Sequence, residues 1–132
     1  MTRIRTYRDL VAWQKGMDVA RRLYAITRDM PPEERFGLTS QMRRAAVSIP
    51  SNIAEGYGRQ TRPDYLKHLR IARGSLVELE TQVTLASDLS MLRDTSEIQA
   101  LIAETDRVLQ ALIMSLERKT RQERKSSKSR NK

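Results

Sequence analysis

The sequence contains no cysteine and little glycine, proline or aromatic residue. Of its 132 residues, five are glycine, four are proline and one is phenylalanine. The absence of cysteine excludes disulfides, thiolate metal sites and cysteine nucleophiles. The glycine-rich stretch Gly56-Tyr57-Gly58 has neither the length nor the Lys-Ser/Thr pair of a nucleotide-binding loop. Several kinds of catalytic and cofactor chemistry are therefore missing.

Long apolar runs are also missing, and histidine is almost absent. No stretch approaches the roughly 20 apolar residues of a membrane span, and the N-terminus has no apolar segment typical of a signal peptide. His68 is the only histidine, so no second histidine can complete a metal site with it. We expect a cytoplasmic protein with no membrane contact, no metal, no cofactor and no catalytic residues, and hence no enzyme.

The sequence does have strong helical periodicity. Apolar residues recur three and four positions apart in four segments, whereas no stretch alternates with the period of a strand. Helices joined by short connections pack as antiparallel neighbours. The pattern predicts one all-α domain, an antiparallel up-down-up-down four-helix bundle over residues 1–116. Its predicted helices span about 9–29, 38–57, 62–90 and 94–118.

The apolar stripes of these segments predict which residues face the core. In the first segment, the predicted core stripe is Leu10, Trp13, Met17, Ala20 and Tyr24. In the second, the stripe continues in phase on both sides of Pro50, so we predict a single kinked helix rather than two. The third segment has the strictest heptad spacing: Tyr65, Leu69, Ala72, Leu76, Leu79, Val83 and Ala86.

The positive charge is concentrated at the C-terminal end. The formal net charge is +9, and residues 117–132 contribute +6 of it through eight Lys or Arg and two Glu. From Arg121 onward no residue is apolar, so we expect 117–132 to be a disordered basic tail or a frayed extension of the last helix. Nucleic acid or an anionic surface would attract this charge, although it could serve solubility alone.

A second basic region lies between Arg43 and Arg73, where the net charge is +5. Such a cluster can neutralise phosphates and give salt-sensitive, sequence-blind binding. Only Tyr57 and Tyr65 accompany it, which favours backbone contacts over base stacking. A solvated basic face is the alternative interpretation. The candidate nucleic-acid-binding residues are Arg43, Arg59, Arg62, Lys67, Arg70 and Arg73.

The segment 38–57 also carries a polar stripe beside its apolar one. Its members are spaced 3, 4, 4 and 3 apart, and they include short polar groups rather than only Lys and Glu. This composition favours a hydrogen-bonded network at a helix–helix or subunit contact, with a solvated face as the alternative. The stripe consists of Gln41, Arg44, Ser48, Asn52 and Glu55.

Three stretches resemble a known family. They are DLVAWQ at 9–14, LTSQMRRAAVSIPSNIAEG at 38–56 and IARGSLVELET at 71–81. They resemble the four-helix-bundle proteins encoded in intervening sequences of 23S ribosomal RNA genes, a family similar to the accessory variability determinant of diversity-generating retroelements. The resemblance covers about residues 5–116. It implies a homopentameric ring or barrel, nucleic-acid binding through basic surfaces and, in retroelements, a reverse transcriptase as partner.

These observations lead to two hypotheses from different classes. The first is a non-enzymatic, oligomeric accessory protein that binds the phosphate backbone of RNA or DNA through the 43–73 region and the tail. The second is a protein–protein assembly module, for example a partner of a reverse transcriptase, with no direct role in nucleic-acid binding. The resemblance implies that the polar stripe serves folding and assembly.

Overall fold

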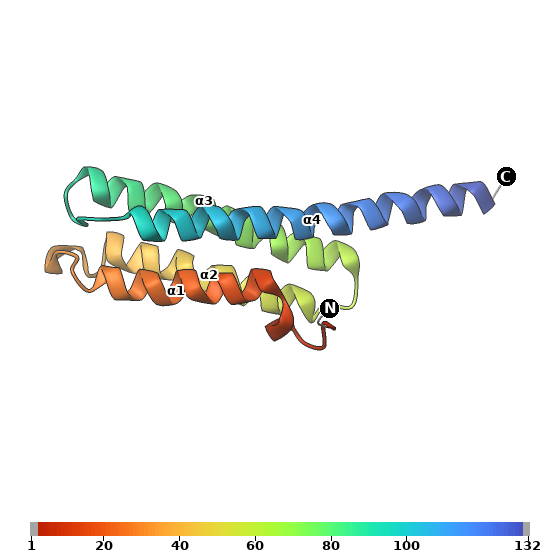
Figure 1. Cartoon of the computed structure of the whole chain (residues 1–132), viewed down its shortest axis with the longest axis horizontal. Helices are drawn as coiled ribbons and strands as arrows, with labels where there is room; N and C mark the ends of the chain where they lie inside the picture. The colour runs from red at the N-terminus through yellow and green to blue at the C-terminus, as the bar shows by residue number, and fades with distance from the viewer. Residues whose placement is uncertain (1–2, 131–132) are drawn as a thin grey trace.

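The computed structural model describes residues 3–130, in which four α-helices pack in two layers (Figure 1). The helices are α1 (Val11–Thr27), α2 (Leu38–Tyr57), α3 (Arg62–Asp88) and α4 (Ser96–Arg130). Short 3-10 helices, η1 (Tyr7–Asp9) and η2 (Pro32–Glu34), precede α1 and α2. Each helix runs antiparallel to the next, and α4 packs back on α1. The predicted all-α four-helix fold is confirmed, and the described residues contain no strand.

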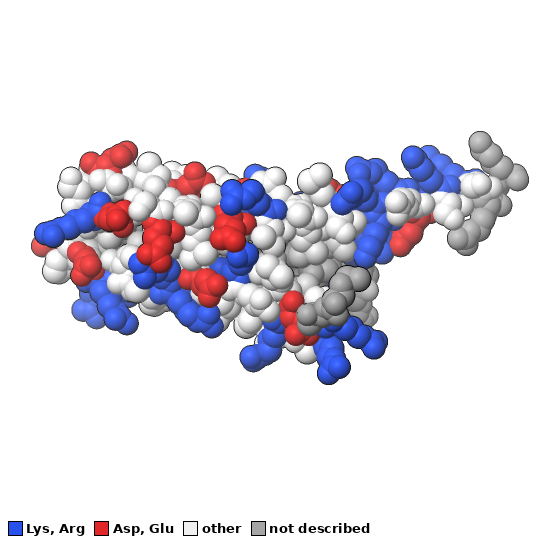
Figure 2. Space-filling model, viewed as in Figure 1, with Lys and Arg blue, Asp and Glu red and all other residues white. Residues whose placement is uncertain are grey.

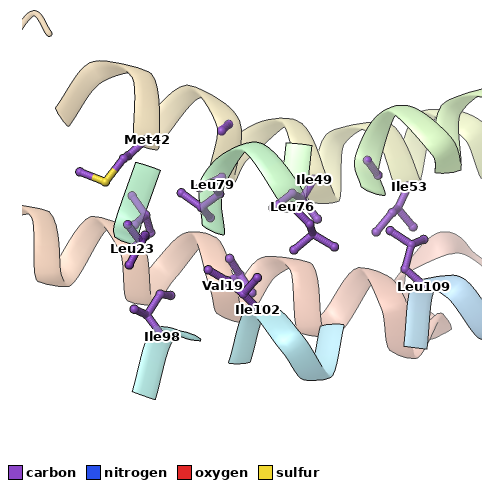
Figure 3. Packing of buried hydrophobic residues seen from close by; sticks show 14 of the residues in the cluster. Val19, Leu23, Met42, Ile49, Ile53, Leu76, Leu79, Ile98, Ile102 and Leu109 are labelled. Atoms are coloured by element: carbon purple, nitrogen blue, oxygen red, sulfur yellow. The ribbon is translucent and has the colours of Figure 1, made fainter. Parts of the chain in front are cut away.

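The core lies along the bundle axis and receives side chains from all four helices. The heptad stripe predicted for α3 is buried from Leu69 to Ala86, while Tyr65 at its start is half-buried. Burial of each large aliphatic side chain stabilises the fold by about 1.5–3 kcal/mol. Figure 3 shows ten core residues that are at most 1% exposed: Val19, Leu23, Met42, Ile49, Ile53, Leu76, Leu79, Ile98, Ile102 and Leu109.

The stripe that α1 buries differs from the predicted one. Its buried residues are Ala12, Gly16, Val19, Leu23 and Thr27. The predicted residues within the helix lie on its flank instead, half-buried or exposed: Trp13, Met17, Ala20 and Tyr24. The cause is close packing of α1 on α2. A Cβ atom at Gly16 would lie 3.3 Å from Cγ2 of Ile49 and 3.4 Å from the backbone nitrogen of Pro50.

α2 continues as a single helix through Pro50, as predicted. Its C-terminal residue Tyr57 is followed by Gly58, which has an ordinary helical φ of −77° rather than a left-handed one. Gly56 is needed for a different reason, because a Cβ atom there would lie 2.7 Å from Cβ of His68. Gly56, within α2, therefore allows α3 to approach α2 closely.

α4 departs furthest from the predicted boundaries. It begins at Ser96 and continues to Arg130, well past the predicted end near 118, and projects beyond the other helices (Figure 1). Of the two expectations for the basic segment, an extension of the last helix agrees with the structure, and a disordered tail does not. Lys, Arg, Gln and Glu are good helix formers, and ion pairs to α3 hold the helix at Glu117 and Glu123. Residues 131 and 132 of the predicted tail lie outside the described residues.

The lengths and polarities of the helices bear on whether any of them could span a membrane. α4 is 35 residues long, but it is polar through its C-terminal part. No helix in the described part of the chain combines the length and apolarity that crossing a membrane requires.

Candidate nucleic-acid interface

Four of the six predicted phosphate-binding residues form ion pairs within the chain. Arg62, at the start of α3, contacts Glu123 of α4 through both terminal nitrogens: Nη1–Oε2 is 2.7 Å and Nη2–Oε1 is 2.9 Å. The hydrogen bond from Arg62 lowers the pKa of Glu123 and raises the pKa of Arg62. Arg70 Nη2 lies 2.8 Å from Oε2 of Glu117. These arginines hold α4 against α3 beyond the predicted end of the bundle.

The other two ion pairs, Arg73–Asp106 and Arg59–Glu55, lie at separate positions along the bundle. Arg73 Nε donates to Oδ1 of Asp106 on α4 at 3.1 Å. Arg59 Nη2 donates to Oε1 of Glu55, one turn earlier in the chain, at 2.8 Å. Exposed pairs of this kind contribute little to stability, typically about 0–1 kcal/mol. They do compensate the positive charge locally, so a phosphate must compete with a carboxylate for these guanidinium groups.

The remaining two candidates differ from each other in position. Lys67 is exposed on α3 and forms no ion pair among the described residues. Arg43 points toward α1: its Nε donates to Oγ1 of Thr27 at 3.0 Å, and its Cζ lies 4.7 Å from the ring centroid of Tyr24. The structure therefore separates Arg43 from Arg62, Arg70 and Arg73, which face α4.

The projecting part of α4 carries a continuous basic face instead. Its members are 3, 3, 1 and 3 residues apart, which places them within about a third of the helix circumference. All of them are exposed, and none forms an ion pair among the described residues. Figure 2 shows positive side chains along this projection. We call this set the α4 basic face: Arg118, Arg121, Arg124, Lys125 and Lys128.

An adjoining side of the same segment faces α3, and Arg121 and Arg124 border it, since both line a hollow with Pro63 and Leu66. Leu116 and Thr120 are half-buried there, and Glu123 forms its pair with Arg62. Glu123 is the only acidic residue after Glu117, and its carboxylate is directed away from the basic face. The sequence showed the charge of this segment, but only helical geometry places the five cations on one side.

The polar stripe of α2 takes part in a hydrogen-bonded chain between α2 and α3. Oγ of Ser48 lies 2.8 Å from Oγ of Ser75. Asn52 Nδ2 donates to the hydroxyl and the carbonyl oxygen of Ser48 at 3.0 and 2.9 Å. Nδ1 of His68 lies 3.1 Å from Oδ1 of Asn52. His68, a lone histidine in the sequence, thus has a structural partner on α2.

The outer members of the stripe remain at the surface. Gln41 and Arg44 are exposed, and Arg44 Nη2 donates to Oγ of Ser40 at 3.2 Å. Together with Ser48, Ser75 and other residues they line a shallow hollow of about 280 Å³. Glu55, the last member, pairs with Arg59. The stripe therefore has an inner part that connects two helices of one chain and an outer part open to solvent.

Comparisons with known proteins place this architecture. The sequence model of the 23S rRNA-intervening sequence proteins matches residues 8–114, so the match ends before the α4 basic face. A crystal structure of a protein of unknown function from the S23 ribosomal protein family of Bacteroides thetaiotaomicron is similar, with a TM-score of 0.70 and 24% identity. The similarity covers 78% of this chain and 98% of that chain, and shows a shared fold. No curated protein matches the sequence.

Proposed function

The chain belongs to the 23S rRNA-intervening sequence protein family, and we propose that it is a cytoplasmic, non-enzymatic accessory protein that binds nucleic-acid backbones. One observation carries the proposal: the α4 basic face presents five uncompensated cations on a helix that projects from the bundle. RNA and DNA both display dense negative charge, so contacts to phosphate need no particular base sequence.

The dimensions of this face suit a nucleic-acid backbone. From Arg118 to Lys128 the helix rises about 15 Å, whereas duplex DNA carries one negative charge per roughly 1.7 Å of its axis. A single helix also fits the major groove of DNA, which is about 12 Å wide. Because the end of the helix extends past the other helices (Figure 1), a duplex can approach Lys125 and Lys128 without meeting the bundle, and Arg121 and Arg124 lie at its border with α3.

Two other features add to the proposal. Lys67 can contact phosphate directly, whereas Arg59, Arg62, Arg70 and Arg73 contribute less because each already has a carboxylate partner. The resemblance of the sequence to its family supports a homo-oligomeric ring or barrel, most simply a pentamer. Several copies of the basic face in one assembly would raise the apparent affinity through multivalency.

A salt titration tests the proposal. The full chain is titrated against a labelled RNA duplex and a structured RNA, and fluorescence anisotropy is followed from about 50 to about 500 mM salt. We expect binding at low salt, with log K falling linearly against log salt at a slope of about −0.9 for each phosphate contacted in a B-DNA control. Absence of binding at low salt, or affinity that does not change with salt, would refute the proposal.

A specific surface supports the second candidate, a protein–protein assembly module. The outward side of α3 exposes Ile71, Val77 and Leu85, each 43–49% accessible. Gly74 lies among them, and a Cβ atom there would meet nothing within 4 Å. A helix from another subunit, or from a partner such as a reverse transcriptase, could therefore pack closely against this side.

Substitution of Gly74 tests this surface without disturbing the chain's own packing. Gly74→Gln adds bulk in open space, and it should stabilise the α3 helix by about 0.5–1 kcal/mol because glycine disfavours helices. We expect a fall in the mass measured by light scattering if α3 forms the subunit contact. Ala111→Gln, at an exposed site of α4, is the matched control. An unchanged mass in both variants would exclude this face as the contact.

A further inference from the structure

Phe36, the only phenylalanine of the chain, is 88% exposed. It follows η2 and borders a hollow of about 490 Å³ between the end of α1, the η2 connection and the start of α2. Tyr24, which is 42% exposed, lines the same hollow from α1. Exposed aromatic residues that gather around a concave surface are typical of binding sites rather than of chance exposure.

The hollow carries positive charge that no acid compensates. Arg35, Arg43 and Arg44 line it, and no acidic residue does. None of the three takes part in an ion pair between residues 3 and 130. Glu34 is near in sequence, but its Oε2 accepts the backbone N–H of Leu38 at 2.9 Å and so caps α2. An anionic ligand is the natural occupant of such a surface.

The arginines and the aromatic rings are arranged together. Cζ of Arg35 lies 5.3 Å from the ring centroid of Phe36, and Arg43 lies over Tyr24. Thr27 accepts the Nε–H of Arg43 at 3.0 Å, which orients the guanidinium and leaves its terminal nitrogens available. Aromatic faces beside oriented guanidinium groups form the stacking and phosphate-binding surface that single-stranded nucleic acids use.

We infer that this hollow binds an unpaired nucleotide of single-stranded RNA or DNA, with its base stacked on Phe36 and its phosphates at Arg35, Arg43 and Arg44. A duplex cannot use the site because its base faces are hidden in the stack. The inference rests on the proposed function and adds a second mode of binding to it. The α4 basic face contacts the phosphate backbones of both single-stranded and duplex nucleic acids, while the hollow selects unpaired nucleotides.

The test compares single-stranded and duplex probes on the full chain. The probes are an oligonucleotide of about ten uridines and an RNA duplex of the same length, both at low salt. We expect Phe36→Ala to lower the affinity for the single strand roughly tenfold and to leave duplex affinity unchanged. Phe36→Trp should retain binding. Met114→Ala is the matched control, because Met114 is 56% exposed beside the ion-paired Arg70 and Arg73.

One further measurement separates stacking from a structural effect. A 2-aminopurine in the single strand should be quenched by the wild type and by Phe36→Trp, and not by Phe36→Ala.

The outcomes distinguish this inference from the proposed function. If the wild type binds the duplex but Phe36→Ala leaves single-strand affinity unchanged, the inference fails and the proposed function stands. If Phe36→Ala lowers the mass by light scattering without affecting binding, the hollow is a contact between copies of the chain and the inference is again overturned. If the wild type binds neither probe, both fail.

Discussion

Two sets of basic residues on the same bundle differ in their partners. On α3, Arg62, Arg70 and Arg73 each contact a carboxylate of α4. On the α4 basic face, by contrast, no residue forms an ion pair within the described range. The first set holds two helices together, and the second leaves its charge available to an external anion. The formal net charge of +9 therefore does not show where phosphates can bind.

The difference follows from helix register. α3 and α4 run side by side in opposite directions, so an arginine on the flank of α3 can reach acids on the flank of α4. Arg121 and Arg124 border the start of α3, where they line a hollow with Pro63 and Leu66. No acid of α3 pairs with a cation of the α4 basic face among the described residues. Whether an arginine is paired with an acid depends on which side chains the neighbouring helix presents. Substitution of these side chains can therefore test the difference between the two sets.

The largest effect is expected when the α4 basic face is neutralised. Replacing its five cations by glutamine keeps good helix formers in place. Duplex affinity at low salt should then fall roughly 100-fold, and the salt slope should decrease by up to about 4. The double variant Arg70→Gln/Arg73→Gln should lower affinity by less than about threefold. Anisotropy titrations measure both, and comparable losses in the two variants would remove the distinction between paired and unpaired arginines.

A smaller effect in the opposite direction is expected when paired arginines are released. Asp106→Asn with Glu117→Gln removes the partners of Arg73 and Arg70. Duplex affinity should rise about threefold to tenfold at low salt, and the salt slope should steepen by about 2, because two more cations can meet phosphate.

The control for released arginines must change the net charge by the same amount. Glu80→Gln with Asp88→Asn does so on the exposed surface of α3, where neither acid has an ion pair among the described residues. We expect little change in this variant. Equal gains in the two double variants would show that total charge, rather than pairing, controls binding.

Much of the fold could be predicted from the sequence, because the spacing of apolar residues identifies the buried face in three of the four helices. α2 has the predicted bounds, and α3 buries its heptad stripe. The predicted core face of α1 was wrong because the helix contacts α2 through Ala12 and Gly16. These residues are small, so the apolar pattern of the sequence does not mark them as buried. The predicted end of α4 near 118 was too early, and the sequence left a disordered tail and an extended helix open, because a segment without apolar residues resembles a disordered one although its helix propensity is high.

The candidate site was less predictable, because it depends on residues far apart in the chain. Arg62 and Glu123 are 61 positions apart, and their contact requires the register of α3 against α4. The hollow joins Tyr24 on α1 to Arg43 on α2 across the η2 connection. The one available signal was the adjacent pair Arg35-Phe36, an aromatic residue in a connection where no core position was expected.

The smallest effect concerns the pair that joins the two sets, Arg62 and Glu123. Its hydrogen bond holds the pKa of Glu123 below the ordinary value of 4.5. Because the pKa of Glu123 is lowered in the folded state, the pair stabilises the attachment of the α4 segment at pH values above the ordinary carboxyl pKa. This contribution is lost as the pH falls through the folded-state pKa. Carboxyl NMR titration of Glu123 should therefore give a midpoint below 4.5 in the wild type and a higher midpoint in Arg62→Gln. Asp94 is the internal control, because Ser96 lowers its pKa independently of Arg62. A midpoint for Glu123 that does not respond to the loss of Arg62 would mean that the basic segment is not held to α3 in solution.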